Sequence, residues 1–127
     1  MATGRAPDPR RAIGRDAEDA AARYLARSGF RIIGRNVRFF EGEIDLVCRD
    51  GDVYVFVEVK CRRTAWGSTP AAAVSWWKQR RLVRLAQHYL KWLRVREARC
   101  RFDVVAVTRA DNGGHRIRHI RAAFDAG

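Results

Sequence analysis

Hydrophobic side chains recur with a helical period in two parts of the chain. Between 12 and 28 they return every three or four residues, and Gly29 follows as a stop signal. Between 75 and 93 the same period returns, Ser75 stands at the N-cap position, and several polar positions are basic. The pattern predicts two amphipathic helices, of which the second is basic.

Shorter apolar runs between and after these helices are typical of β-strands. Gly34 interrupts the first run, and Asp50 with Gly51 forms a dipeptide that closes tight hairpins. We expect strands at 30–40, 41–49, 52–60, 100–108 and 115–120. The order of helix, three strands, helix and the remaining strands predicts a small α/β domain in which helices flank a central mixed sheet.

The length and the ends of the chain suggest a single soluble domain. At 127 residues the chain is long enough for its own hydrophobic core. Residues 1–11 are rich in proline and arginine and are expected to form a flexible basic tail, so 12–127 would be the domain. No apolar run approaches the roughly 20 residues that cross a bilayer, and no signal-peptide pattern is visible. We therefore expect a cytoplasmic protein without a membrane partner.

The net charge indicates the class of partner, and the cysteine spacing bears on whether a zinc site is present. The formal net charge is +12 and the pI is about 11.1, which favours a polyanionic partner, with nucleic acid ahead of an anionic membrane. No long basic segment has a strong lipid-facing side, so an anionic membrane is the weaker candidate. The three cysteines lack the spacing of a zinc site, and we expect reduced, mostly buried thiols.

Two charged residues, Glu58 and Lys60, interrupt the otherwise apolar strand at 52–60. Successive strand side chains point to opposite faces, so these two look the same way. A two-residue loop at the hairpin dipeptide would place Glu43 opposite Glu58, with Asp45 diagonal to Glu58 on the same face. A three-residue loop would move Asp45 to the other face.

Three carboxylates on one sheet face repel one another and raise one another's pKa. A hard divalent cation, Mg²⁺ or Mn²⁺, relieves this repulsion, and such ions typically take carboxylate, water and phosphate oxygens together. A metal in this position would polarise a phosphoryl group and activate a water, while Lys60 would orient the water or offset transition-state charge. The pattern predicts a site that cleaves phosphodiesters.

The stretches GEIDLV and VFVEVKCRR resemble the PD-(D/E)xK signature of restriction-endonuclease-like nucleases. A closer similarity is to the YraN family of small bacterial proteins. It is carried by EDAAARYLARSGF, RNVRFFEGEIDL, FVEVKCRR, the region from WGSTPAAAV to AQHYL, RFDVV and AAF, so it spans Ile13 to Phe124. The resemblance implies a restriction-endonuclease-like core for this α/β domain.

The resemblance also implies roles for individual residues. Asp45 corresponds to the first acid of the motif, Glu58 to the second and Lys60 to the lysine, and all three would be catalytic. The implied metal ligands are Asp45, Glu58 and the backbone carbonyl of Val59. Glu43 and Glu18 are further candidates. Some archaeal junction resolvases, which this arrangement resembles, use a glutamate of the first helix at the metal site.

Structural roles compete with several of these assignments. The charges on the strand face could form a structural ion network, and Glu43 could pair with Arg35 or Arg38. Asp103 is expected to be a structural acid paired with an arginine. Trp66, Trp76 and Trp77 could stack on bases, but helical spacing favours core packing.

We therefore expect a metal-dependent endonuclease that hydrolyses DNA phosphodiester bonds, with branched or damaged DNA as one candidate substrate. The candidate phosphate contacts are Arg62, Arg63, Lys78 and Arg81. The alternative is a non-catalytic nucleic-acid-binding module that keeps the nuclease fold. Cutting a four-way junction would suit a homodimer with a symmetric pair of sites. The sequence leaves the oligomeric state and the form of DNA open.

Overall fold

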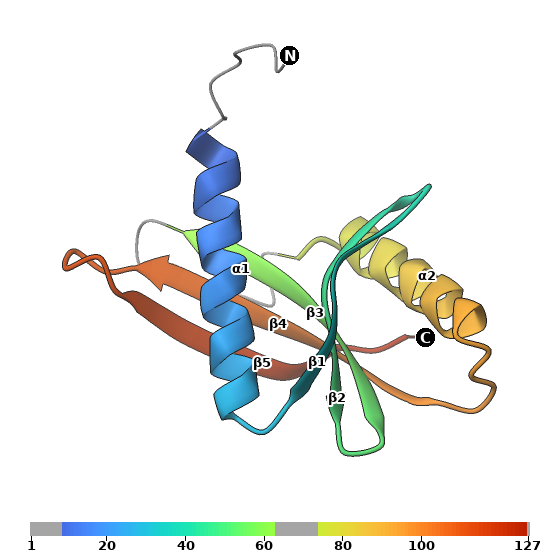
Figure 1. Ribbon diagram of the computed structural model, residues 1–127. Coiled ribbons are helices and arrows are strands. Elements are labelled where there is room, and N and C mark those ends of the chain that lie inside the picture. Colours follow the sequence, from blue (N-terminus) through green and yellow to red (C-terminus); the bar gives the residue numbers. More distant parts are fainter. Residues whose placement is uncertain (1–8, 63–73, 127) are drawn as a thin grey trace, which may run out of the picture.

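The computed structural model describes residues 9–62 and 74–126, which form two helices and five strands (Figure 1). In chain order the elements are α1 (Pro9–Arg27), β1 (Arg31–Phe39), β2 (Gly42–Asp50), β3 (Val53–Arg62), α2 (Trp76–Trp92), β4 (Arg99–Arg109) and β5 (His115–Phe124). The order of elements agrees with the pattern in the sequence, and the last predicted strand extends to Phe124.

The strands form one mixed sheet in the order β1-β2-β3-β4-β5. Neighbouring strands are antiparallel except β3 and β4, which are parallel and are connected through α2. A parallel pair needs such a long crossover, because a short turn can only reverse the chain. The two helices lie on opposite faces of the sheet, so the predicted α/β architecture with a mixed sheet is confirmed (Figure 1).

Side chains of β3 alternate between two hydrophobic cores. Val55 and Val57 pack in the cluster beneath α1, whereas Tyr54 and Phe56 pack in the cluster beneath α2. A strand that is covered on both sides reads as a nearly continuous apolar run, which is why 53–57 contains no polar residue outside Tyr54. This double burial makes the charges that follow in the same strand conspicuous.

The helix boundaries follow from residues with known end preferences. Ser75 caps α2, and its Oγ accepts a hydrogen bond from the Lys78 N–H at 3.2 Å, as expected. α1 begins at Pro9, so the helix includes residues 9–11, which the sequence assigned to a tail. Proline is well tolerated in a first helical turn, since its missing N–H has no helical partner there. Residues 1–8 lie outside the described part.

The register of the β2–β3 hairpin differs from the prediction. Asp50 pairs with Val53, so the two loop residues are Gly51 and Asp52 rather than Asp50 and Gly51. Gly51 has φ +61°, and hairpin turns of type II′ favour glycine at this first loop position. The loop is still two residues long, but every partner is displaced by two, and Glu43 is not opposite Glu58.

Two further features bear on the expectations from composition. Neither helix in the described ranges has the length and apolar character needed to cross a membrane. Of the cysteines, Cys48 is buried, and burial raises the pKa of its thiol to about 12. Cys61 and Cys100 are exposed, which corrects the expectation that all the thiols are mostly buried.

Candidate metal centre

The candidate centre lies where β2 and β3 separate. Their ladder runs from Asp50–Val53 to Leu46–Val57, and beyond it β2 stays paired with β1 while β3 stays paired with β4. Just past the last pair, the Asp45 carboxylate accepts the Val59 N–H at 2.8 Å. This bond fixes the acid of β2 against the backbone of β3 at the fork.

Asp45 also marks a break in the alternation of β2. Ile44 packs in the cluster under α2 and Leu46 in the cluster under α1, although residues two apart in a regular strand share a face. The irregularity brings the Asp45 carboxylate close to α1. The hairpin argument predicted that the acids project from one regular sheet face. The structure shows that they do not.

Three carboxylates converge at this point. Glu18 of α1 and Glu43 and Asp45 of β2 each place an oxygen within 4.8 Å of the others. The neighbours of Glu18 in the helix, Ala17 and Ala21, are buried against the sheet, which turns Glu18 inward. Its flanking acids point elsewhere, since Asp19 pairs with Arg35 and Asp16 contacts His115. Oxygen donors at this spacing can share one hard cation.

The electrostatics show that two of these acids, Asp45 and Glu18, are poorly compensated. Burial raises the pKa of Asp45 to about 8, and the negative charges of Glu58, Glu18 and Glu43 add to the effect, while the Val59 N–H opposes it. Burial also raises the pKa of Glu18, against a hydrogen bond from Asn36 that lowers it. A cation among these oxygens would supply the charge that the protein groups do not.

Glu43 combines the two roles that the sequence left open. Its Oε2 lies 3.1 Å from the Arg38 Nε, and it also belongs to the acid cluster. The two residues are directly paired between β1 and β2. Arg35 is not its partner, because that side chain contacts Asp19.

Asn36 is a site residue that sequence reasoning missed. Its backbone has φ +49°, in the left-handed region, and its side chain hydrogen-bonds Glu18. Asparagine is among the few non-glycine residues that adopt this conformation readily. The sequence did carry a signal of an irregular backbone here, because the strand was expected to break at Gly34, two residues before Asn36.

Glu58 and Lys60 of β3 form the second half of the site. The Lys60 Nζ is 3.2 Å from the Glu58 Oε1, and the Lys78 Nζ of α2 is 4.0 Å from the same oxygen. Contact with Lys60 and burial lower the pKa of Lys78. Glu58 is not part of the 4.8 Å cluster of acids, but it is near enough to Asp45 to raise the pKa of that carboxyl.

An open hollow of about 510 Å³ lies beside the acid cluster. Glu18 and Asn36 line it together with two arginines, Arg15 and Arg38. Cations at the mouth of an acidic site are suited to binding the phosphates that flank a scissile bond. Sequence reasoning did not place Arg15 here, because a cation on a helix surface has no distinguishing spacing.

The predicted phosphate-binding residues fall into two groups. Lys78 and Arg81 lie on α2, and the Arg81 side chain packs beside Gly42, where an added Cβ would lie 3.4 Å from the arginine Cδ. Arg62 is the last residue of β3. Arg63 lies outside the described residues, as does Trp66.

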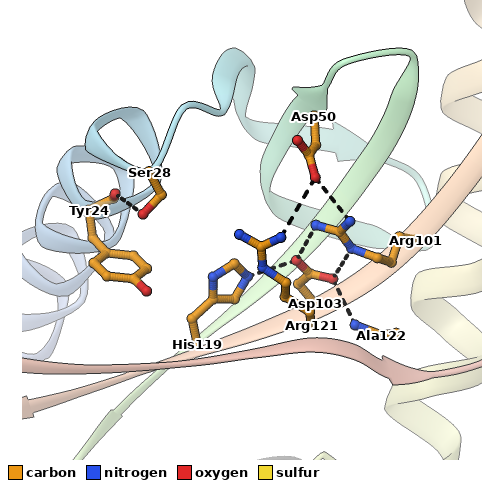
Figure 2. A network of polar contacts seen from close by, with 8 residues as sticks. All are labelled: Tyr24, Ser28, Asp50, Arg101, Asp103, His119, Arg121 and Ala122. Atoms are coloured by element: carbon orange, nitrogen blue, oxygen red, sulfur yellow. Dashed lines mark hydrogen bonds and ion pairs between the residues drawn. The ribbon is translucent and has the colours of Figure 1, made fainter.

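Asp103 has the structural role that the sequence predicted (Figure 2). It is fully buried and accepts two hydrogen bonds from Arg101 at 2.9 and 3.0 Å and one from the Ala122 N–H at 3.0 Å, with the His119 Nε2 at 2.7 Å. Burial alone would raise its pKa, but the bonds from His119, Arg101 and Ala122 bring the pKa below its usual value. Asp103 is satisfied by the Arg101 guanidinium and by further hydrogen bonds, in contrast to Asp45.

The tryptophans of α2 contradict the prediction of core packing. Trp76 is 59% exposed and Trp77 is 76% exposed. The buried positions of the helix begin later, with Leu82, and the two indoles fall in its first turn. The helical period was correct, but it could not show where along α2 the buried stripe starts.

Comparisons with known proteins support one family. The model described as Uncharacterised protein family UPF0102 matches residues 17–107, which include every acid and lysine of the candidate centre. A UPF0102 protein of Symbiobacterium thermophilum is 53% identical over 116 residues, covering 91% of this chain and 98% of the relative. UPF0102 proteins of Anaeromyxobacter dehalogenans (48% over 118 residues, 93% and 87% covered) and Geobacter sulfurreducens (42% over 125 residues, 98% of both covered) are similar too.

Proposed function

The chain belongs to the UPF0102 family, also called the YraN family, and from its site we propose a metal-dependent nuclease that hydrolyses phosphodiester bonds of DNA. One observation carries the proposal. Carboxylates from α1 and β2 converge within 4.8 Å, beside a glutamate and lysine of β3, in a chain with a net charge of +12. A phosphate-rich substrate would meet positive charge on approach and a cation-binding cluster at the fork.

The donor set fits Mg²⁺ or Mn²⁺. All of its ligand atoms are carboxylate oxygens, which hard divalent cations prefer. Glu18, Glu43 and Asp45 would hold the ion, and Glu58 and the Val59 carbonyl are further candidates at the same fork. When bound, the metal would polarise a phosphoryl oxygen and lower the pKa of a water.

The protein groups around this cluster have separate tasks. Lys60, held beside Glu58, supplies a positive charge next to the reacting phosphate and can orient a water through its N–H groups. Arg15 and Arg38 at the hollow can bind phosphates next to the scissile bond. Asn36 keeps Glu18 oriented toward the cluster. The restriction-endonuclease-like core is part of this proposal, since the sheet splits at the motif acids.

A cleavage assay tests the proposal. Purified protein would be incubated with single-stranded, duplex, flap and four-way-junction DNA in Mg²⁺, Mn²⁺ or EDTA. We expect metal-dependent cleavage of at least one substrate, and a loss of about 100-fold or more in Asp45→Asn, Glu58→Gln and Lys60→Ala. Asp111→Asn removes the same charge in the exposed β4–β5 turn and should cleave like the parent.

The same assay distinguishes a nuclease from the alternative function. DNA binding without cleavage under every metal condition would favour a non-catalytic nucleic-acid-binding module. Equal activity in Asp45→Asn and the parent would show that the acid cluster is not the site of cleavage.

A further inference from the structure

The first turn of α2 presents two neighbouring tryptophans to solvent. Trp76 and Trp77 are 59% and 76% exposed, and their rings meet edge to face with centroids 4.7 Å apart. Indole rings gain much from burial, so adjacent exposed ones indicate a surface that a ligand covers.

These tryptophans adjoin the candidate metal centre. Lys78 follows them directly, and its Nζ lies 4.0 Å from the Glu58 Oε1. Trp77 and Arg81 are one turn apart, so they share a face of the helix. The Arg81 side chain packs beside Gly42, the neighbour of Glu43 in the acid cluster. A ligand on this face would extend from the indoles to the acids.

The charge around the indoles identifies the class of ligand. α2 contains no acidic residue, and its cations are Lys78, Arg80, Arg81, Arg84 and Lys91. Among the residues that the structure describes, no acid pairs with Arg81. Exposed aromatic rings with interleaved cations suit single-stranded nucleic acid, whose bases offer free π-faces and whose backbone is anionic. In a duplex the base faces are stacked on one another and are not accessible to an indole.

A membrane surface fits this helix poorly. Helices that lie in a bilayer interface bury an apolar stripe along their whole length. The apolar stripe of α2, Leu82, Leu85, Ala86 and Tyr89, is already buried against the sheet. The exposed indoles of Trp76 and Trp77 lie together in the first turn, and the remaining exposed indole, Trp92, lies at the opposite end of the helix, so no continuous apolar stripe faces outward.

We propose that Trp76 and Trp77 stack on unpaired bases, so that the substrate is DNA with a single-stranded segment next to the cleavage site. An overhang, a flap or an open branch point meets this description, and a continuous duplex does not. The inference deepens the proposed nuclease function and rests on it, because the bound DNA is a substrate only if the protein is a nuclease. The binding step itself needs neither metal nor cleavage.

Binding in EDTA tests the inference with the full chain. Fluorescence anisotropy would measure the affinity for a labelled oligothymidylate of about 12 nucleotides and for a blunt duplex of equal length. The double variant Trp76→Ala with Trp77→Ala should lose about tenfold or more in affinity for the single strand, and less than about twofold for the duplex. The matched control is Trp92→Ala, because Trp92 is 69% exposed at the other end of α2 and should leave both affinities unchanged.

A second substitution guards against a folding artefact. Trp76→Phe with Trp77→Phe keeps two aromatic faces and should retain more single-strand affinity than the alanine pair. The inference is overturned if the alanine pair binds the single strand like the parent, or if both DNAs lose affinity equally. It is also overturned if the alanine double variant binds vesicles of anionic phospholipid more weakly than the parent but binds both DNAs like the parent. Absence of cleavage by the parent would remove the nuclease proposal without affecting these binding results.

Discussion

Replacing Asp45 by asparagine should stabilise the metal-free protein, although the residue is partly buried at the centre of the fold. Asparagine keeps the shape of the side chain and can still accept the Val59 N–H, so the fork should persist. What disappears is an ionisable group whose charged form is opposed by burial and by the acids Glu58, Glu18 and Glu43. The substitution therefore removes repulsion without opening a cavity.

The magnitude follows from the pKa of Asp45, which rises from 3.8 to about 8 in the folded state. At pH 7 the folded protein holds a proton at this carboxyl that the unfolded chain releases, which costs up to about 4 kcal/mol. Local relaxation reduces this, and we expect a gain of about 1–3 kcal/mol, or roughly 4–10 °C in melting temperature for a domain of this size.

The sign of the pH dependence is fixed by the same pKa. Between about pH 4 and pH 8 the folded state of the parent binds more protons than the unfolded state, so its stability falls as pH rises. Asp45→Asn lacks this dependence. The stability gain should be near zero at about pH 4 and should increase toward pH 8.

Asp103→Asn is a matched control because it makes the same chemical change at a fully buried acid. There the acid is bonded to Arg101 and lies against His119, and neutralising it leaves a partly buried guanidinium with less compensation. We expect a loss of about 3 kcal/mol. The two variants should therefore shift the melting temperature in opposite directions.

The assay is thermal melting of the three proteins in EDTA and in excess Mg²⁺, at several pH values. Mg²⁺ should raise the melting temperature of the parent, because a ligand bound only by the folded state stabilises it, and this rise should shrink in Asp45→Asn. If Asp45→Asn melts lower than the parent in EDTA at pH 7 and Mg²⁺ shifts neither protein, the acids form a structural network and the metal centre is refuted.

Three further outcomes test other parts of the structure. Because the pKa of Asp103 is lowered, its contribution is complete above about pH 4 and is lost as pH falls through the folded pKa, so Asp103→Asn should flatten the acid limb of a stability–pH profile. Arg94 has φ +59° after the end of α2, so Arg94→Gly should raise the urea midpoint by relieving about 1 kcal/mol of strain, and a lower midpoint would contradict this. Lys78→Ala with Arg81→Ala should reduce the slope of log affinity for DNA against log salt by about two, and an unchanged slope would remove both cations from the interface.

Much of the architecture could be read from local patterns. The period of apolar positions located both helices, and the nearly continuous apolar run before Glu58 located a strand, which the structure covers on both faces. Ser75 and Gly29 marked helix ends because capping depends on short-range backbone geometry. The inward orientation of Glu18 follows from the helical period, which places this acid beside buried alanines.

The sequence also determined the chemical character of the site, because the acids, the lysine of β3 and the net charge of +12 are independent of register. The tertiary structure decided which atoms meet. A one-residue shift of the hairpin loop displaced every partner, and the separation of β2 from β3 turned Asp45 toward Glu18 while Glu58 stayed with Lys60. Such contacts depend on how strands diverge and on where a helix first meets the sheet, and both are set by packing between segments far apart in the chain.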